Sequence, residues 1–323
     1  MQVVYAPRAL AILYSILTRL PNRMPWLLPA NICPVVPITF LKARVPFDFV
    51  DIAPDDLCMN REQVTDQLKK RKIGGVLYAH TYGDPFIPHD FFLSLKNIDS
   101  EIFIVDDRCL CVPEVDADPG WVADLTLFST GYAKVLELRY GGGYGFIQDW
   151  VEYQPVNLPY AKTDYIELEK KYKDALKYRS WFEYIDSDWL QTQPMPEDFL
   201  QTGEWYDYRK QIQNKLAAIL DYRAEINVIY TSQLPKNIQL LDRFQEWRFN
   251  IRVKNQQRML AAIFDAGLFA SAHYASLAGI MATGSAPCAD ALAGDVINLF
   301  NDHHFDKSKA LQVCSVIQEY YEG

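Results

Sequence analysis

Short apolar runs alternate with helix-prone segments through the first half of the chain. Runs rich in β-branched and aromatic residues cover 45–52, 75–80, 101–105, 125–129 and 144–147. Polar, helix-prone stretches at 60–72 and 89–95 lie between the first three of them. This rhythm is typical of a mainly parallel sheet covered by helices, and such sheets bind ligands at the carboxyl ends of their strands. We therefore expect an α/β fold with its functional site at that edge of the sheet.

The rest of the chain predicts an insertion followed by a smaller lobe. Residues 151–208 break the rhythm, with many aromatic and acidic side chains and a loop at Pro194 and Pro196. A long amphipathic helix is expected over 209–230. Strands at 247–253 and 269–273 and helices at 256–266 and 306–322 are expected after it. We expect a large domain over 1–208, containing the irregular insertion 151–208, and a small C-terminal domain over 209–323.

Composition excludes several classes of protein. The chain has 323 residues, half of them hydrophobic, which is enough for a large core. Its formal charge of −9 and the lack of a basic run argue against nucleic acid as a partner. No apolar run reaches the ~18 residues that a membrane span needs. Six scattered cysteines indicate free thiols rather than a disulfide framework, and no metal-binding spacing is present. We expect a cytoplasmic protein without a metal site.

Two sequence features carry chemistry. The apolar run at 101–105 ends in Asp106-Asp107, and the run at 125–129 ends in Ser129 and is followed by Lys134. Taken singly, either feature is also typical of a solvated loop. Together, an acid at one strand end and a lysine after the next strand are what pyridoxal phosphate requires. The lysine binds the cofactor aldehyde, and the carboxylate keeps the pyridine nitrogen protonated.

The order of these motifs resembles that of the DegT/DnrJ/EryC1/StrS sugar aminotransferases, which are fold-type I pyridoxal-phosphate enzymes. The Ile104–Cys109 segment is similar to the I-E-D-A-A of that family. Phe128-Ser129 with Lys134 and the glycines at 141–145 resembles its F-S-x-x-x-x-K and glycine turn. Further matches are Leu28-Pro29-Ala30 for V-P-S, Phe49-Val50-Asp51 for F-V-D, His80-Thr81-Tyr82-Gly83 for H-x-Y-G, and the small-lobe markers His273-Tyr274 and Val296-Ile297-Asn298-Leu299.

The resemblance implies a fold, a reaction and a set of site residues. The fold is the aspartate-aminotransferase-like, three-layer α/β fold with a small C-terminal lobe. Lys134 would be the Schiff-base lysine, Asp107 the partner of the pyridine nitrogen, and Ser129 a phosphate ligand. His273 and Tyr274 would contact the substrate. The implied reaction transfers an amino group, usually from glutamate, to a nucleotide-linked keto-sugar for surface polysaccharide or a glycosylated metabolite, in a homodimer.

The chain departs from the family pattern at several of its motifs. Arg8 lies within Tyr5–Leu10, where the family has its phosphate-binding S-G-T-x-A-L, and is the expected phosphate contact there. Cys33 takes the place of the aromatic residue that stacks on the cofactor. Leu110 replaces a glutamine or histidine, and Asp207-Tyr208-Arg209 stands for N-Y-R. An N-terminal segment of the family is expected to be missing.

Two alternative functions stay open from the sequence. One is a degenerate member of the family that binds a ligand or a partner without catalysis, which the altered phosphate-binding motif favours. The other is a pyridoxal-phosphate-dependent sugar dehydratase. That branch of the family characteristically lacks the lysine, so Lys134 argues against it.

Overall fold

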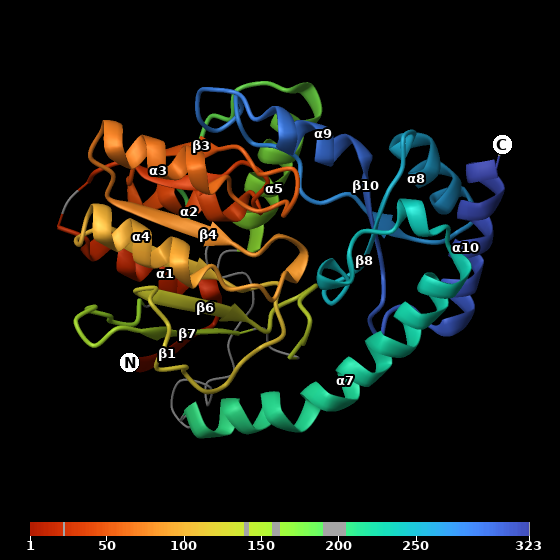
Figure 1. The fold of residues 1–323 in the computed structure, drawn as a ribbon, viewed down its shortest axis with the longest axis horizontal. Coiled ribbons are helices and arrows are strands. Elements are labelled where there is room, and N and C mark those ends of the chain that lie inside the picture. Colours follow the sequence, from red (N-terminus) through yellow and green to blue (C-terminus); the bar gives the residue numbers. More distant parts are fainter. Residues whose placement is uncertain (22, 139–141, 157–161, 190–204, 323) are drawn as a thin grey trace.

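A seven-stranded mixed sheet forms the centre of the larger part of the molecule (Figure 1). The computed structural model describes residues 1–21, 23–138, 142–156, 162–189 and 205–322. The strand order is β1-β7-β6-β5-β4-β2-β3. The strands are β1 (Gln2–Ala6), β2 (Trp26–Pro29), β3 (Phe47–Val50), β4 (Gly75–Ala79), β5 (Phe103–Asp107), β6 (Leu125–Ser129) and β7 (Gly143–Ile147). Neighbours from β3 to β6 are parallel, whereas β7 runs antiparallel to β6 and β1. The expected α/β fold with a mostly parallel sheet is confirmed.

Helices cover both faces of this sheet. Because successive side chains of a strand point to opposite faces, Leu28 and Val105 pack into one core and Leu27 and Ile104 into the other. The first core lies under α1 (Ala9–Arg19), α2 (Val35–Ala43) and α5 (Lys162–Tyr178), and the second under α3 (Arg61–Lys70) and α4 (His89–Ile98). Among the helices that the structure describes, none is both long enough and apolar enough to cross a bilayer.

A second, three-stranded sheet in the order β8-β10-β9 forms a smaller lobe with its own core. Its elements are α7 (Trp205–Gln233), β8 (Phe249–Arg252), α8 (Gln256–Asp265), β9 (Ala270–Ser271), α9 (Pro287–Asp295), β10 (Val296–Leu299) and α10 (Lys307–Glu322), with short 3-10 turns at Lys236–Ile238 and Asp242–Phe244. A further 3-10 turn, Thr81–Gly83, follows β4 in the large lobe. The lobe lies beside the large sheet at the far end of α7 (Figure 1).

The long helix α7 belongs to both lobes. Its 29 residues span about 43 Å at 1.5 Å per residue. Tyr208 and Ile212 near its start pack in a core beside β7, whereas Ile226 and Tyr230 pack in the core of the small lobe. The expected domain boundary at 208–209 therefore falls inside one continuous helix. The expected loop at Pro194 and Pro196 lies outside the described residues.

After β9 the chain returns to the large sheet. Leu277, Ile280 and Met281 are buried in the core under α1 and α2. The Leu277 backbone N–H donates to the Ala30 carbonyl oxygen at 2.9 Å. This return brings the segment after β9 to the carboxyl end of β2, which is where a ligand site is expected.

The start of β7 lies directly against the start of α1. A β-carbon added at Gly143 would meet the backbone nitrogen and α-carbon of Ala9, and neither can move without shifting the helix. At Gly294, near the end of α9, an added β-carbon would meet no heavy atom within 4 Å.

We expect Gly143→Ala to lower the free energy of unfolding by about 2 kcal/mol, since the overpacked methyl group displaces backbone. Gly294→Ala is the matched control and should leave stability unchanged or slightly raised, because alanine favours helix. Urea unfolding followed by circular dichroism measures both. Equal effects of the two substitutions would contradict the close packing of β7 on α1.

Candidate functional site

A cavity of about 520 Å³ lies at the carboxyl ends of β2, β4, β5 and β6. The strands contribute Asn31 and Cys33 after β2, Thr81 after β4, Asp107 at the end of β5 and Ser129 at the end of β6. The start of α1, the loop after β6, one side of α5 and Tyr274 complete the wall. The cavity therefore occupies the edge of the sheet at which the sequence predicts a site.

The two adjacent carboxylates at the end of β5 face opposite sides of the sheet. Val105 packs in the core under α1, so Asp107, two residues later, points to the same side and reaches the cavity. The Asp107 carboxylate accepts a hydrogen bond of 3.0 Å from the Cys109 backbone N–H. Asp106 points the other way and is 1% exposed.

Asp106 is held in a buried charge network. Its Oδ1 lies 2.7 Å from Nε2 of His80, and its Oδ2 accepts a hydrogen bond of 2.7 Å from Nε of Arg108. Burial by itself would raise the pKa of Asp106, but His80 and Arg108 outweigh it and lower that pKa below its usual value. Burial would lower the pKa of His80, and Asp106 raises it instead. The network anchors the strand end that presents Asp107.

Lys134 lies in the loop after β6 and lines the same cavity as Asp107. The backbone of this loop is held from the small lobe and α7. The Arg223 guanidinium donates to the carbonyl oxygens of Lys134 at 3.0 Å and Val135 at 3.1 Å, and Nε1 of Trp247 donates to that of Ala133 at 2.6 Å. Burial lowers the pKa of Arg223 to about 10. The sequence gives no sign of these roles of Arg223 and Trp247, because their partners are backbone oxygens about 90 to 115 residues away along the chain.

The start of α1 forms one side of the cavity. Pro7, Arg8, Ala9 and Leu10 all line it, and Gly142 donates its backbone N–H to the Pro7 carbonyl oxygen at 3.0 Å. The first backbone N–H groups of a helix have no partner within the helix and carry a partial positive charge. An anionic group is therefore favoured at this side of the cavity, beside Arg8.

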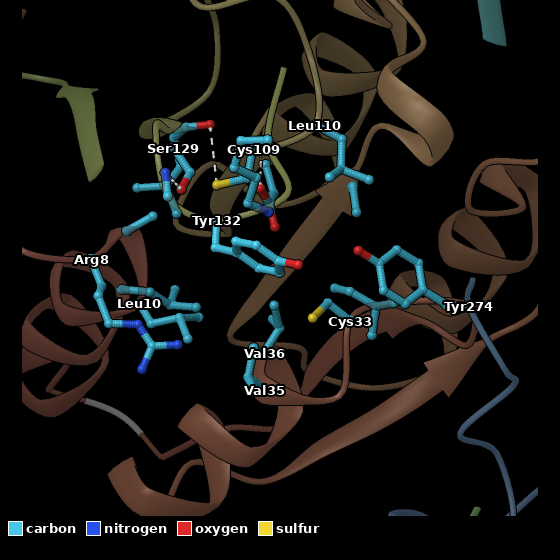
Figure 2. A pocket seen from close by; sticks show the side chains of 18 of the residues that line it. Arg8, Leu10, Cys33, Val35, Val36, Cys109, Leu110, Ser129, Tyr132 and Tyr274 are labelled. Carbon is cyan, nitrogen blue, oxygen red and sulfur yellow. Dashed lines mark hydrogen bonds between the residues drawn. The ribbon is translucent and has the colours of Figure 1, made fainter. Parts of the chain in front are cut away.

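The opposite side of the cavity carries Cys33 and Tyr274. Figure 2 shows Arg8 and Ser129 on one side of the Tyr132 ring and Cys33 and Tyr274 on the other. Tyr132 is 78% exposed, and its ring lies across the cavity in this view. Burial raises the pKa of the Cys33 thiol, and the nearby charge of Lys134 opposes this effect. The charges of Asp107 and Arg8 also shift the pKa of this thiol, so the charged groups of Lys134, Asp107 and Arg8 all lie near Cys33.

The structure brings six of the seven residues proposed from the sequence to the cavity wall. These are Arg8, Cys33, Asp107, Ser129, Lys134 and Tyr274. His273 is exposed and is not part of the wall within the described chain; its ring packs beside Trp247, with ring centroids 5.9 Å apart. Arg209, in the segment similar to N-Y-R, pairs with Asp116 on the surface.

Helix α5, in which the sequence indicated no chemistry, also lines the cavity. Tyr165, Glu169 and Tyr172 reach it from successive turns of this helix. The Tyr165 ring lies 5.5 Å from the Arg8 guanidinium carbon, measured to the ring centroid. Tyr165, Glu169 and Tyr172 follow one another at spacings of four and three residues, which puts their side chains on one face of α5. That spacing is a signal the sequence carries, although it does not say what the face contacts.

One cluster of metal-ligating side chains lies outside the cavity. The ligand atoms of Glu137, His303 and His304 lie within 4.8 Å of one another, and both histidines are exposed. The cluster was not expected from the sequence, because Glu137 and the histidine pair are far apart along the chain.

We expect Asp106→Asn to lower the free energy of unfolding by about 3 kcal/mol, because it removes the buried charge that faces both His80 and Arg108 and leaves the Arg108 guanidinium only its ion pair with the half-exposed Glu114. Asp116→Asn, which breaks the exposed pair with Arg209, should change stability little. Urea unfolding at neutral pH measures both. Losses of similar size would show that the Asp106 network does not anchor the end of β5.

Comparisons with known proteins agree on the fold. No protein-family model matches this chain. No curated protein sequence matches it either. Solved structures do match over nearly the whole chain. A DegT DnrJ EryC1 StrS aminotransferase from Brucella abortus has a TM-score of 0.68 at 15% identity, over 100% of this chain and 87% of that chain. The aminotransferase TlmJ from Streptoalloteichus hindustanus has a TM-score of 0.70 at 16% identity, over 99% and 86%.

The sugar aminotransferase CalS13 from Micromonospora echinospora matches with a TM-score of 0.65 at 16% identity, over 98% of this chain and 87% of that chain. At such identities the similarity concerns the fold. The chain therefore has the fold of the DegT/DnrJ/EryC1/StrS aminotransferases, as its sequence motifs predicted.

Proposed function

We propose that this protein is a pyridoxal-phosphate-dependent aminotransferase that transfers an amino group from glutamate to a nucleotide-linked keto-sugar. One observation carries the proposal: Lys134, Asp107 and Ser129 line a single cavity at the carboxyl edge of the sheet. The fold neighbours include Spr1654 from Streptococcus pneumoniae, which has been solved in PLP and PMP forms. The proposed cofactor thus agrees with both the wall of the cavity and the fold.

The residues around the cavity fit the cofactor. Pyridoxal phosphate needs a primary amine, an acid for its pyridine nitrogen and an anion site for its phosphate. Lys134 supplies the amine and Asp107 the acid. The start of α1, Arg8 and the Ser129 hydroxyl supply the anion site. When bound, the cofactor supplies an aldehyde and an electron-withdrawing ring that stabilises negative charge beside the amine nitrogen.

The side chains of the chain itself hold and move protons in this proposal. The Asp107 carboxylate accepts a hydrogen bond from the pyridine nitrogen and keeps a proton there. The Cys109 N–H, which donates to Asp107 at 3.0 Å, holds this carboxylate in place. Nζ of Lys134 takes the proton from the amino-bearing carbon of the donor and returns it during transfer to the acceptor.

The sugar acceptor is proposed from the fold neighbours and from the face of α5. CalS13, a fold neighbour, is a sugar aminotransferase. Tyr165 and Tyr172 offer aromatic surfaces to the apolar face of a sugar ring, and Glu169 offers a carboxylate to its hydroxyl groups. The nucleotide, the glutamate donor, a cytoplasmic location and a homodimer belong to the same proposal.

The sugar dehydratase is the weaker alternative, because Lys134 lines the cavity. A degenerate family member that binds a ligand or a partner differs from the proposal in turnover, whether or not it binds the cofactor. The departures at Arg8 and Cys33 favour this second candidate, since both alter the cofactor's surroundings. A measurement of turnover is therefore needed beside a measurement of binding.

We expect Lys134→Ala to abolish covalent fixation of pyridoxal phosphate, because Lys134 carries the only primary amine among the described residues that line the cavity. The protein is incubated with the cofactor, reduced with borohydride and digested, and the modified peptide is identified by mass spectrometry. The control is Lys215→Ala, which changes an exposed lysine of α7 and should behave as the parent chain. Fixation at an unchanged level in the Lys134→Ala variant would refute the assignment.

We expect the parent chain, loaded with pyridoxal phosphate, to convert glutamate to 2-oxoglutarate in a single turnover without any sugar present. Asp107→Asn should slow this step at least about tenfold, because an amide no longer stabilises the protonated pyridine nitrogen. Chromatographic quantification of 2-oxoglutarate measures both. Glutamine is tested as a second amino donor. A chain that binds the cofactor but converts neither glutamate nor glutamine to its keto acid would favour the alternative of a binding protein without catalysis.

A further inference from the structure

The cluster of Glu137, His303 and His304 is formed by both lobes. Glu137 lies in the loop after β6 that also carries Lys134, and the two histidines lie between β10 and α10 in the small lobe. One ligand atom of each side chain lies within 4.8 Å of the others. Glu137 is partly buried, whereas both histidines are exposed. An ion at this place would therefore be reached from solvent.

Two of these ligand atoms are separated as they are on one metal ion. Nε2 of His304 lies 3.4 Å from Oε2 of Glu137. This distance is above the usual range of about 2.7–3.2 Å for a hydrogen bond from nitrogen to oxygen. Two ligands that each lie about 2.05 Å from a tetrahedral zinc ion are about 3.3 Å apart. The two atoms therefore have the spacing of shared coordination.

Contacts within the protein hold both sides of the cluster. Oε1 of Glu137 accepts a hydrogen bond of 2.5 Å from the Ala133 backbone N–H, and Oε2 faces His304. The His304 backbone N–H donates to Oδ1 of Asp302 at 3.1 Å, and Asp302 forms a buried ion pair with Arg248. Because these ligands are already held, little conformational entropy is lost when an ion binds.

His303 reaches the same ion by rotation of its side chain. Its ring centroid lies 3.9 Å from that of His304. The ligand atoms are at most 4.8 Å apart, against about 3.3 Å around a tetrahedral ion. Exposed side chains change rotamer readily, so this difference is closed without a shift of the backbone.

The ligand types select the class of ion. Two imidazole nitrogens and one carboxylate oxygen favour zinc and similar divalent transition metals, whereas magnesium and calcium prefer oxygen ligands. A zinc site with three such ligands keeps a fourth position for water. Nζ of Lys309 lies 3.4 Å from the His304 carbonyl oxygen, and its charge opposes that of the ion. We therefore expect weaker binding than in a zinc site with four protein ligands.

We propose that Glu137, His303 and His304 bind one zinc or similar divalent transition-metal ion, which joins the loop of Lys134 to the small lobe. The inference does not depend on the proposed function. It departs from the expectation from sequence, which considered spacing along the chain, whereas this cluster forms only where the two lobes meet. The ion adds a second contact to this loop, beside that of Arg223.

Isothermal titration calorimetry with Zn²⁺ alone tests the site. The full chain, purified without a histidine tag and freed of metal by a chelator, should bind one equivalent. Glu137→Gln, His303→Gln and His304→Gln should each weaken binding at least about tenfold, because each removes one of three ligands. In Glu137→Gln the amide oxygen still accepts from the Ala133 N–H, so the amide nitrogen, which does not bind metal, faces the histidines.

The matched control is His89→Gln, which removes a histidine at the start of α4 and should bind Zn²⁺ as the parent chain does. Because free cysteines also bind zinc, the absorption spectrum of the Co²⁺-loaded parent identifies the ligands. It should show d–d bands without a thiolate charge-transfer band. A thiolate band, unchanged affinity in Glu137→Gln, or a parent chain that binds no Zn²⁺ would each overturn the inference.

Hydrogen exchange followed by mass spectrometry tests the link between the lobes. With Zn²⁺, the amides of 133–138 and of 301–305 should both exchange at least about twofold more slowly in the parent chain, and neither segment should change in Glu137→Gln. Slower exchange of 301–305 alone would show an adventitious ion on the histidine pair and overturn the inference. Thermal melts of the metal-free variants show whether each is folded, and the folded variants decide the result.

Discussion

The buried contact of Asp106 with His80 and Arg108 anchors the end of β5, and the arrangement of the site depends on it. Asp106 points to the face of the sheet opposite that of Asp107, and Asp106 and Arg108 are almost completely buried. Because strand side chains alternate, fixing Asp106 on one face presents Asp107 on the other. A loosely held strand end would leave the proposed ligand of the pyridine nitrogen without a defined position.

The other half of the proposed cofactor site depends on contacts between the two lobes. Lys134 lies in a loop whose carbonyl oxygens are held by Arg223 from α7 and whose neighbour Ala133 contacts Trp247. Helix α5, from the segment between the two lobes, forms another part of the cavity wall. The cavity is bounded by the large sheet, by the start of α1, by α5 and by Tyr274 from the segment after β9, which explains why its residues are spread so widely along the sequence.

Sequence patterns predicted the elements with strong local signals. The strand at 125–129 and the helix that begins after Asn60 are found as expected, the latter with the Asn60 side chain capping the Gln63 N–H. The short strands β1 and β2 were not predicted, because four or five apolar residues have no distinctive period.

The order of the motifs predicted that Asp107 and Lys134 belong to one site, and both line the cavity. It could not show that α5 lines the same cavity, because the spacing of Tyr165, Glu169 and Tyr172 does not say what that helix face contacts. His273 was expected at the site and lies outside its wall, since a motif gives position along the chain and not side-chain direction.

The central claim is that Lys134 and Asp107 hold opposite ends of one cofactor ring. A crystal structure of the chain grown with pyridoxal phosphate tests this most directly. The account predicts electron density continuous with Nζ of Lys134, with the pyridine nitrogen within hydrogen-bond distance of the Asp107 carboxylate. Cofactor density elsewhere on the chain, with this cavity holding only solvent, would contradict it.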